Sequence, residues 1–300
     1  MIKNGNVLRD PRDKRGLPES YDKDQMQEAP GVQAEMKPVP DSGEKTYEGS
    51  GRLKGRRAFI TGGDSGIGRA VAIAFAREGA QVAINYLDDE KKDAESLAGL
   101  LSQEGIELIT VPGDISTEEG ARNVVKKARE KLGEIDTLVL NAGTQRANDN
   151  FEEIGTDQLL STFYTNVFSP FWMVQEAAKD MPKGSSVIFT SSSEFYKPAA
   201  KLTDYAASKY AVVGLSRALA KELIERGIRV NTVCPGSTWT PLEISGGLMK
   251  EDIPDHGSVN LMQRAAQPYE IAGVYVFLAS EEASFVTCAT YGVDGGMETV

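Results

Sequence analysis

A tyrosine and a lysine four residues apart are the clearest chemically active pair in the sequence: Tyr205 and Lys209, in the stretch YAASK. In a helix this spacing places both side chains on one face, one turn apart. A phenol normally has a pKa near ~10, and a neighbouring ammonium group stabilises the phenolate and lowers that pKa. The pair could therefore give a proton to a carbonyl oxygen or take one from an alcohol. Taken alone, the spacing more often indicates an amphipathic helix with a surface lysine, because such pairs are frequent.

A glycine-rich stretch earlier in the chain could bind a phosphate group. The segment ITGGDSGIGRA, residues 60–70, follows an apolar run and opens an amphipathic one, with glycines at 62, 66 and 68. Glycine lets a backbone approach an anion closely, and a helix N-terminus adds free N–H groups and a positive dipole. The segment therefore favours a phosphate loop in a strand-to-helix turn. A tight turn without a ligand is the alternative.

Short apolar segments alternate with helical patterns from residue 56 onward. The segments expected to be strands are rich in β-branched residues and span 56–61, 81–86, 107–112, 136–141, 185–190, 228–233 and 289–294. Between most of them, apolar positions recur at helical intervals up to a glycine. The alternation predicts one doubly wound α/β domain over residues 51–300, with a seven-stranded, mainly parallel sheet and helices on both faces. Ligands of such sheets bind beyond the carboxyl ends of the strands.

Two segments do not follow this alternation of strand and helix patterns. Residues 1–50 are polar, mixed in charge and hold five of the thirteen prolines, so they should form no core of their own. We expect them to be disordered, or to extend as an arm over the domain or a neighbouring subunit. Residues 234–268 follow a strand but contain no clear element, which is typical of a lid or binding loop at the ligand edge.

Composition excludes several classes of function. The net charge of -11 disfavours binding to nucleic acid or to an anionic membrane surface, since both need a basic face. No apolar run approaches the roughly 18 residues that span a bilayer, and the two cysteines lie too far apart in the sequence for a redox or metal motif. The single histidine, His256, is expected to be an exposed loop residue, and no metal site is expected. These features fit a cytoplasmic protein.

Taken together, the motifs resemble those of the short-chain dehydrogenases/reductases. The resemblance rests on TGGDSGIG, the triplet Asn141-Ala142-Gly143, Asn166 in FYTNVFS, Ser192 in TSSS, YAASK, Pro235-Gly236 with Thr240, and the terminal VDGG. These motifs lie in the family's order and cover residues 53–300. The N-terminal arm resembles that of a bacterial subgroup. The resemblance implies a Rossmann-type fold and hydride transfer between a nicotinamide cofactor and a carbonyl or alcohol substrate.

The resemblance also implies roles for the matching residues. Tyr205 would be the acid/base, and Lys209 would lower its pKa and bind ribose. Ser192 would orient the substrate oxygen, and Asn166 would support a proton relay. The residues implied for the cofactor are Gly62, Asp64, Ser65, Gly66, Ile67, Gly68, Asn85, Tyr86, Leu87, Asp114, Ile115, Asn141, Ala142, Gly143, Tyr205, Lys209, Pro235, Gly236, Thr238 and Thr240. Substrate-facing candidates are Gln145, Arg146, Glu194, Phe195, Tyr196, Trp239 and the loop 241–262. Family members most often form tetramers, so a homo-oligomer is expected.

The end of the second expected strand favours NAD slightly over NADP. The family's usual NAD-selecting aspartate is absent at Asn85, and its usual NADP-selecting base is absent at Ser65 and Leu87. The two aspartates at 88–89 would repel the 2'-phosphate of NADP, and no neighbouring base would pair with that phosphate. The expected cofactor is therefore NAD or NADP, with NAD preferred.

Two other functions stay open at this point. A non-catalytic dinucleotide sensor or scaffold could share the fold, although it would not need Ser192, Tyr205 and Lys209 together. A sugar-nucleotide epimerase or dehydratase can share the Y-x-x-x-K motif, but that branch usually has a different glycine spacing and a C-terminal substrate domain. One departure from the family pattern is Cys288, which stands where glycine is usual and leaves the local backbone open to question.

Overall fold

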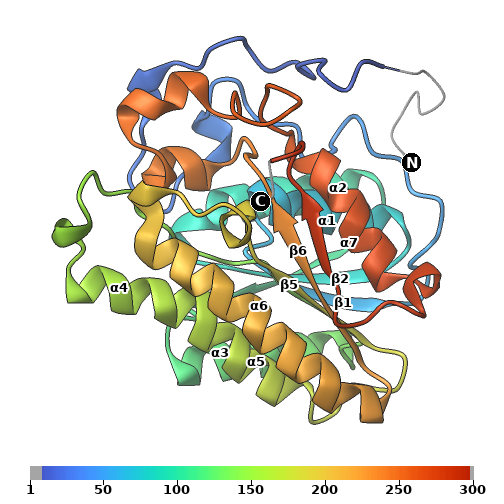
Figure 1. Ribbon diagram of the computed structural model, residues 1–300. Coiled ribbons are helices and arrows are strands. Elements are labelled where there is room, and N and C mark those ends of the chain that lie inside the picture. Colours follow the sequence, from blue (N-terminus) through green and yellow to red (C-terminus); the bar gives the residue numbers. More distant parts are fainter. Residues whose placement is uncertain (1–8, 298–300) are drawn as a thin grey trace.

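The computed structural model describes residues 9–297 of the chain, and within them one seven-stranded parallel sheet forms the centre of the molecule (Figure 1). The strands are β1 (Arg57–Thr61), β2 (Gln81–Tyr86), β3 (Leu108–Pro112), β4 (Thr137–Leu140), β5 (Ser186–Thr190), β6 (Arg229–Pro235) and β7 (Thr290–Val293). Their order is β3-β2-β1-β4-β5-β6-β7, and every neighbouring pair is parallel. The expected doubly wound fold is confirmed.

Helices cover both faces of this sheet. They are α1 (Gly66–Arg77), α2 (Lys91–Gln103), α3 (Glu118–Leu132), α4 (Thr156–Phe163), α5 (Ser169–Ala177), α6 (Thr203–Leu223) and α7 (Pro268–Ala279). One core packs α1, α2 and α7 on the sheet through side chains such as Phe75 and Tyr275, and the other packs α3, α5 and α6 through Val125 and Met173. Among the described residues, every helix is too short or too polar to cross a bilayer.

The strand order reverses at β1, and this reversal creates the ligand crevice. β1 pairs with β2 on one side and with β4 on the other. The chain therefore leaves β1 toward one edge of the sheet and leaves β4 toward the opposite edge, so the two following loops diverge. Gly62 and Asn141 begin these loops. The first motif residues thus lie at the point where such sheets bind ligands.

The segment between β6 and α7, residues 236–267, lies over the carboxyl ends of the strands and is called the lid below (Figure 1). It holds only short turns, over Glu243–Gly247 and Lys250–Asp255. A single isolated bridge joins Thr238 to Ala266. The backbone of the lid has few regular hydrogen bonds of its own, so its position depends on what packs against it.

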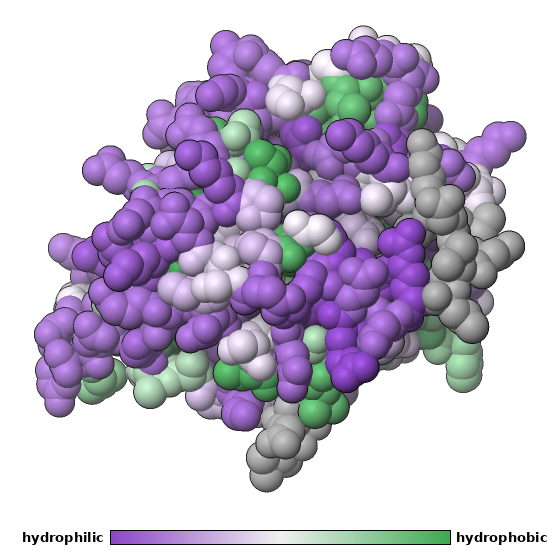
Figure 2. All heavy atoms as spheres, turned by 90° about the horizontal axis from the view of Figure 1, so that it is seen from above, coloured by the Kyte–Doolittle hydropathy of each residue, from purple (hydrophilic) through white to green (hydrophobic). Residues whose placement is uncertain are grey.

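The described part of the N-terminal arm, residues 9–50, packs against the lid and α1. Leu17, Tyr21 and Met36 are buried in a small apolar core that also contains Trp239 of the lid. Figure 2 shows the face above the arm and lid, which is mainly hydrophilic with small apolar patches. Leu17, Tyr21 and Met36 therefore pack inward from the arm, whereas Met26 and Val39 are exposed on its outer side.

Cys288 lies just before β7 on unusual backbone. Its φ of 61° is in the left-handed region, which glycine adopts more easily than other residues. Its N–H donates to the carbonyl oxygen of Val230 in β6 at 2.7 Å, so the backbone is held beside β6 just before β7 begins. The departure from the family's glycine therefore leaves the strand pairing intact and places the strain on Cys288 itself.

Candidate active site

The glycine loop connects β1 to α1 in the geometry that its spacing indicated. Gly62 and Gly66 have φ values of 58° and 52°. A Cβ atom on Gly68 would lie 1.8 Å from the carbonyl oxygen of Gly62, so only glycine fits there. Asn141 Nδ2 donates to the carbonyl oxygens of Thr61 at 3.2 Å and Gly62 at 3.1 Å. The loop is thus fixed to the end of β4, with the N-terminus of α1 toward the crevice.

Tyr205 and Lys209 lie in the first two turns of α6, with Ser192 facing them from the end of β5. Lys209 Nζ is 5.3 Å from the centre of the Tyr205 ring and donates to the carbonyl oxygen of Thr190 at 3.1 Å. Ser192 and Tyr205 interact through a side-chain hydrogen bond. All three side chains are at least nine-tenths buried. The structure therefore brings together the three residues expected to handle the substrate oxygen.

Asn166 lies behind this group rather than in it. It is in a π-helical turn (Tyr164–Phe168) between α4 and α5. Its Oδ1 accepts from the N–H of Thr144 at 2.8 Å, and its Nδ2 donates to Thr144 O at 2.9 Å and Ser208 Oγ at 3.0 Å. These bonds hold the loop after β4 against α6. They account for a buried asparagine in a helix, and its role in a proton relay stays a prediction.

The pKa values differ from the simple expectation for a tyrosine–lysine pair. Burial raises the pKa of Tyr205, although the hydrogen bond with Ser192 acts in the opposite direction. The carboxylates of Glu243 and Glu194 raise it further. Burial also lowers the pKa of Lys209 to about 8. The net shift of the Tyr205 pKa in the chain by itself is therefore upward, because both groups are desolvated together, and the role of Lys209 in favouring the phenolate stays a prediction.

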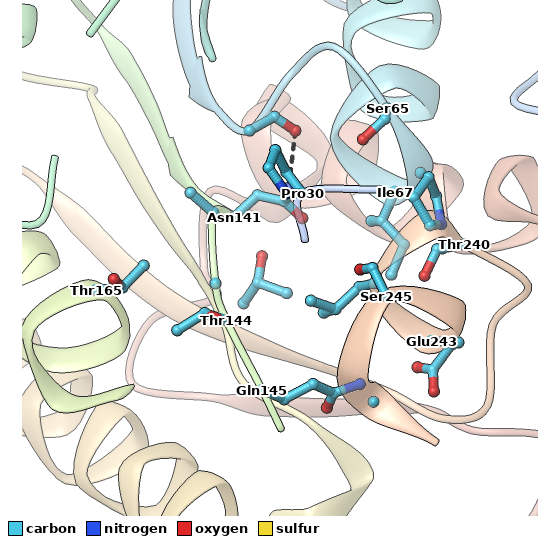
Figure 3. Close-up of a pocket in the computed structure, with 18 of the residues that line it drawn as sticks. Pro30, Ser65, Ile67, Asn141, Thr144, Gln145, Thr165, Thr240, Glu243 and Ser245 are labelled. Carbon is cyan, nitrogen blue, oxygen red and sulfur yellow. Dashed lines mark hydrogen bonds between the residues drawn. The ribbon is translucent and has the colours of Figure 1, made fainter. Parts of the chain in front are cut away.

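A cavity of about 570 Å³ runs from the glycine loop to Tyr205 (Figure 3). Every residue implied for the cofactor lines it except Gly68, which instead makes room for the loop. Asn166 does not line it either. The Asn85 side chain is turned into the sheet, where Nδ2 donates to the carbonyl oxygens of Val111 at 3.1 Å and Gly113 at 2.9 Å. Both N–H groups of the Asn85 amide are therefore used within the sheet and are not available to a ribose.

The substrate end of the cavity is polar and carries carboxyl groups. Gln145 and Glu194 line it as expected, and Figure 3 shows Glu243 of the lid facing Gln145. Burial raises the pKa of Glu243 to about 7. Four expected substrate-facing residues do not line the cavity: Arg146, Phe195, Tyr196 and Trp239. Sequence reasoning missed Ser161, Thr165, Leu202 and the arm residues 29–31, none of which has a local signal.

The expectation of an exposed His256 is wrong. Its side chain is 8% exposed and lies among aromatic rings, 6.3 Å from Tyr21 and 6.1 Å from Trp239 between ring centres. Tyr21 in turn stacks on Trp239 at 4.1 Å. Burial lowers the pKa of His256 to about 4, so the imidazole is neutral at pH 7. The arm covers this part of the lid. The composition of the loop around His256 does not show that a distant segment packs over it.

Acidification should weaken the fold through His256. The unfolded chain binds a proton at this residue near pH 6.5, whereas the folded chain binds it only near pH 4. Stability that is present above pH 6.5 is therefore lost as the pH falls, by about 2 kcal/mol between pH 7 and pH 5. Urea unfolding of His256→Asn at both pH values should lack this loss. An identical pH dependence in the variant and the parent protein would contradict the assignment.

Comparison with known proteins finds a matching family model, similar curated proteins and similar solved structures. A family model described as Enoyl-(Acyl carrier protein) reductase matches residues 62–298. The "Uncharacterized oxidoreductase YhxD" of Bacillus subtilis is 52% identical over 92% of this chain and 93% of its own. The "NADPH-dependent aldehyde reductase 1, chloroplastic" of Arabidopsis thaliana is 42% identical over 88% of this chain and 93% of its own. A solved short chain dehydrogenase from Burkholderia cenocepacia, in complex with NADP, superposes with a TM-score of 0.76 at 31% identity, covering 82% of this chain and 99% of that chain.

Proposed function

The chain belongs to the short-chain dehydrogenase/reductase family, and from that premise we propose that Tyr205, Lys209 and Ser192 carry out its reaction. It is an NAD(P)-dependent oxidoreductase that acts on alcohol and carbonyl groups. The convergence of these three side chains at one end of a cavity that begins at the glycine loop carries the assignment. Relatives named as reductases and oxidoreductases support catalysis over a non-catalytic sensor.

A dinucleotide fits the lining of this cavity. The turn at Gly62 and Gly66 and the N-terminus of α1 suit a diphosphate, since free N–H groups and the helix dipole favour an anion there. In this proposal Ile115 lies at the adenine end, Lys209 binds ribose and Thr240 contacts the nicotinamide half. The bound cofactor supplies or accepts the hydride.

The transfer of the proton to and from the substrate oxygen depends on residues of the chain itself. Tyr205 holds a proton on its hydroxyl group, donates it to the carbonyl oxygen during reduction and takes it back from an alcohol during oxidation. The Ser192 hydroxyl donates a hydrogen bond to the same oxygen and fixes its position. The Lys209 ammonium favours the phenolate that forms when Tyr205 gives up its proton. Asn166 holds the loop after β4 against α6 and supports the relay of the next proton.

A panel of aldehydes and ketones tests this function. The purified protein should oxidise NADH or NADPH only in the presence of a carbonyl substrate, with alcohol formed in equal amount. Dinucleotide binding can be measured separately by titration. Binding without turnover on the whole panel would favour the non-catalytic reading.

Between the two dinucleotides, we propose that NAD is preferred. Among the described residues that line the cavity, Lys209 is the only lysine or arginine, and the buried Asp64 and the half-buried Glu90 lie near the end of β2. A 2'-phosphate there would meet carboxyl groups and no basic partner. The relatives do not support this preference, since the Burkholderia structure contains NADP and the Arabidopsis relative is named for NADPH. We expect kcat/KM to be at least about 10-fold higher with NADH; a higher value with NADPH would overturn the proposal.

We also propose that the protein is a homotetramer. Large apolar side chains are exposed along α4, the π-helical turn that follows it, α5 and α6: Leu159, Leu160, Tyr164, Phe168, Phe171 and Tyr210. An apolar surface of this kind on neighbouring helices is typical of an interface. Light scattering on the purified protein should give a mass of four chains. A mass of one chain at micromolar concentration would contradict the proposal.

A cytoplasmic location is likewise proposed. Cys234 is buried and Cys288 is exposed, and both are free thiols. Free thiols of this kind suit a reducing compartment. Fractionation of the source cells, followed by immunodetection, tests the location.

A further inference from the structure

Part of the N-terminal arm forms a wall of the dinucleotide cavity. Ala29, Pro30 and Gly31 line the same cavity as the glycine loop, and Figure 3 shows Pro30 beside Asn141 and Ile67. We propose that residues 27–33, called the strap below, belong to the dinucleotide-binding site and retain the bound dinucleotide. Release of the dinucleotide then requires the strap to detach.

The strap is fixed on the cofactor side by Gln33. This side chain is 4% exposed, and its Oε1 accepts from the N–H of Gly66 at 2.7 Å. Gly66 is the first residue of α1 and lines the cavity, so the arm satisfies one of the free N–H groups of the phosphate loop. The Gln33 backbone N–H donates to Asp93 Oδ2 at 2.7 Å, and its Nε2 donates to Ser42 Oγ at 3.1 Å. A buried amide with its polar atoms paired makes a firm anchor.

The strap is fixed on the opposite side by the lid. The Gln27 N–H donates to the carbonyl oxygen of Ile244 at 3.0 Å. A Cβ atom on Gly31 would lie 3.0 Å from both Cβ and the carbonyl oxygen of Pro241, so the two backbones are in close contact. Gln27 Oε1 also accepts from the N–H of Val32 at 2.5 Å, which holds the strap in a compact turn. The strap therefore bridges the two sides of the crevice.

The lid and the glycine loop also approach each other beneath this bridge. A Cβ atom on Gly66 would lie 3.1 Å from Cβ of Thr240. The lid, the glycine loop and the strap therefore meet at one place, where the diphosphate of a dinucleotide fits. A molecule of that length cannot leave sideways until these contacts separate.

The strap lies before the residues that the family model matches, which begin at residue 62. The Burkholderia chain is matched over 99% of its length but covers 82% of this chain. About a fifth of this chain therefore has no counterpart there, which is about the length of the arm. The strap is an addition to the shared cofactor site, and its loss should leave the shared part of the site in place.

Dinucleotide release tests the proposal directly. Purified Gln33→Ala is loaded with NADH or NADPH, whichever the parent protein binds, and chased with an excess of the oxidised form while the fluorescence of the reduced nicotinamide is followed. Loss of the bond to Gly66 should raise the dissociation rate constant about 10-fold. The matched control is Gln25→Ala, because within residues 9–297 the Gln25 side chain hydrogen-bonds only to Asp22 and Lys37 of the arm itself. The control should release the dinucleotide at the parent rate.

A second variant keeps the test decisive if Gln33→Ala fails to fold. Gly31→Ala pushes the strap from Pro241 and leaves Gln33 unchanged, so it should also release the dinucleotide about 10-fold faster. A folded variant of either kind with the parent dissociation rate would overturn the proposal. The inference rests on NAD(P) binding, and turnover by the parent protein establishes that separately. A failure of the strap proposal therefore cannot be mistaken for a failure of the proposed function.

Discussion

Replacing Tyr205 with phenylalanine is expected to lower kcat by about 10³-fold, because it removes the group that exchanges a proton with the substrate oxygen. The ring keeps its volume and its place against Lys209, so the lining of the cavity should persist. Dinucleotide affinity should change by less than about 3-fold, since the hydroxyl group acts on the substrate. Steady-state turnover of the best aldehyde in the panel, together with a dinucleotide titration, measures both quantities.

The matched control for this change is Tyr210→Phe. Tyr210 lies in the same helix, five residues further along, but its side chain is 45% exposed. The control should keep the parent kcat, and both variants should keep the parent melting temperature to within a few degrees, since each loses only one hydroxyl group. Full turnover by Tyr205→Phe would remove the tyrosine from the mechanism.

Replacing Gly68 with alanine should abolish tight dinucleotide binding. The added Cβ atom would lie 1.8 Å from Gly62 O and 2.7 Å from Asn141 Nδ2, so the glycine loop must move away from the end of β4. A clash with backbone of this kind costs about 3 kcal/mol or more. We expect at least about 100-fold weaker binding and a lower free energy of unfolding. Isothermal titration and urea unfolding measure the two effects.

Gly99→Ala is the matched control for this change. Gly99 lies in α2, and a Cβ atom there meets no other atom within 4 Å. Because alanine favours a helix over glycine, the control should be stabilised by about 1 kcal/mol and bind the dinucleotide normally. Equal binding by Gly68→Ala and the parent protein would show that the glycine loop does not hold the diphosphate.

Much of the site could be predicted because its residues are neighbours along the chain. The spacing of Tyr205 and Lys209 depends only on the helical repeat, and the glycine loop depends on one turn between β1 and α1. The alternation of strands and helices then brings the other motifs to one edge of the sheet. For this reason nearly all of the expected cofactor residues line the same cavity.

Other features depend on residues that are distant in sequence, and local patterns do not contain them. Trp239 was expected to face substrate, yet Tyr21 of the arm stacks on it and removes it from the cavity. The same packing buries His256, which was expected to be exposed. The direction of the Tyr205 pKa shift likewise reflects burial and carboxyl groups from other loops rather than its partner in YAASK.

The sequence by itself determined the strands, the helices, the glycine loop and the catalytic residues implied by the family motifs. These follow from periodicity and turn chemistry, which act over a few residues. Only the tertiary structure decided the course of the arm, the contact of Gln33 with Gly66 and the protonation preferences of the buried groups. Those depend on desolvation and on packing between segments far apart in the chain, because burial is a property of the whole fold.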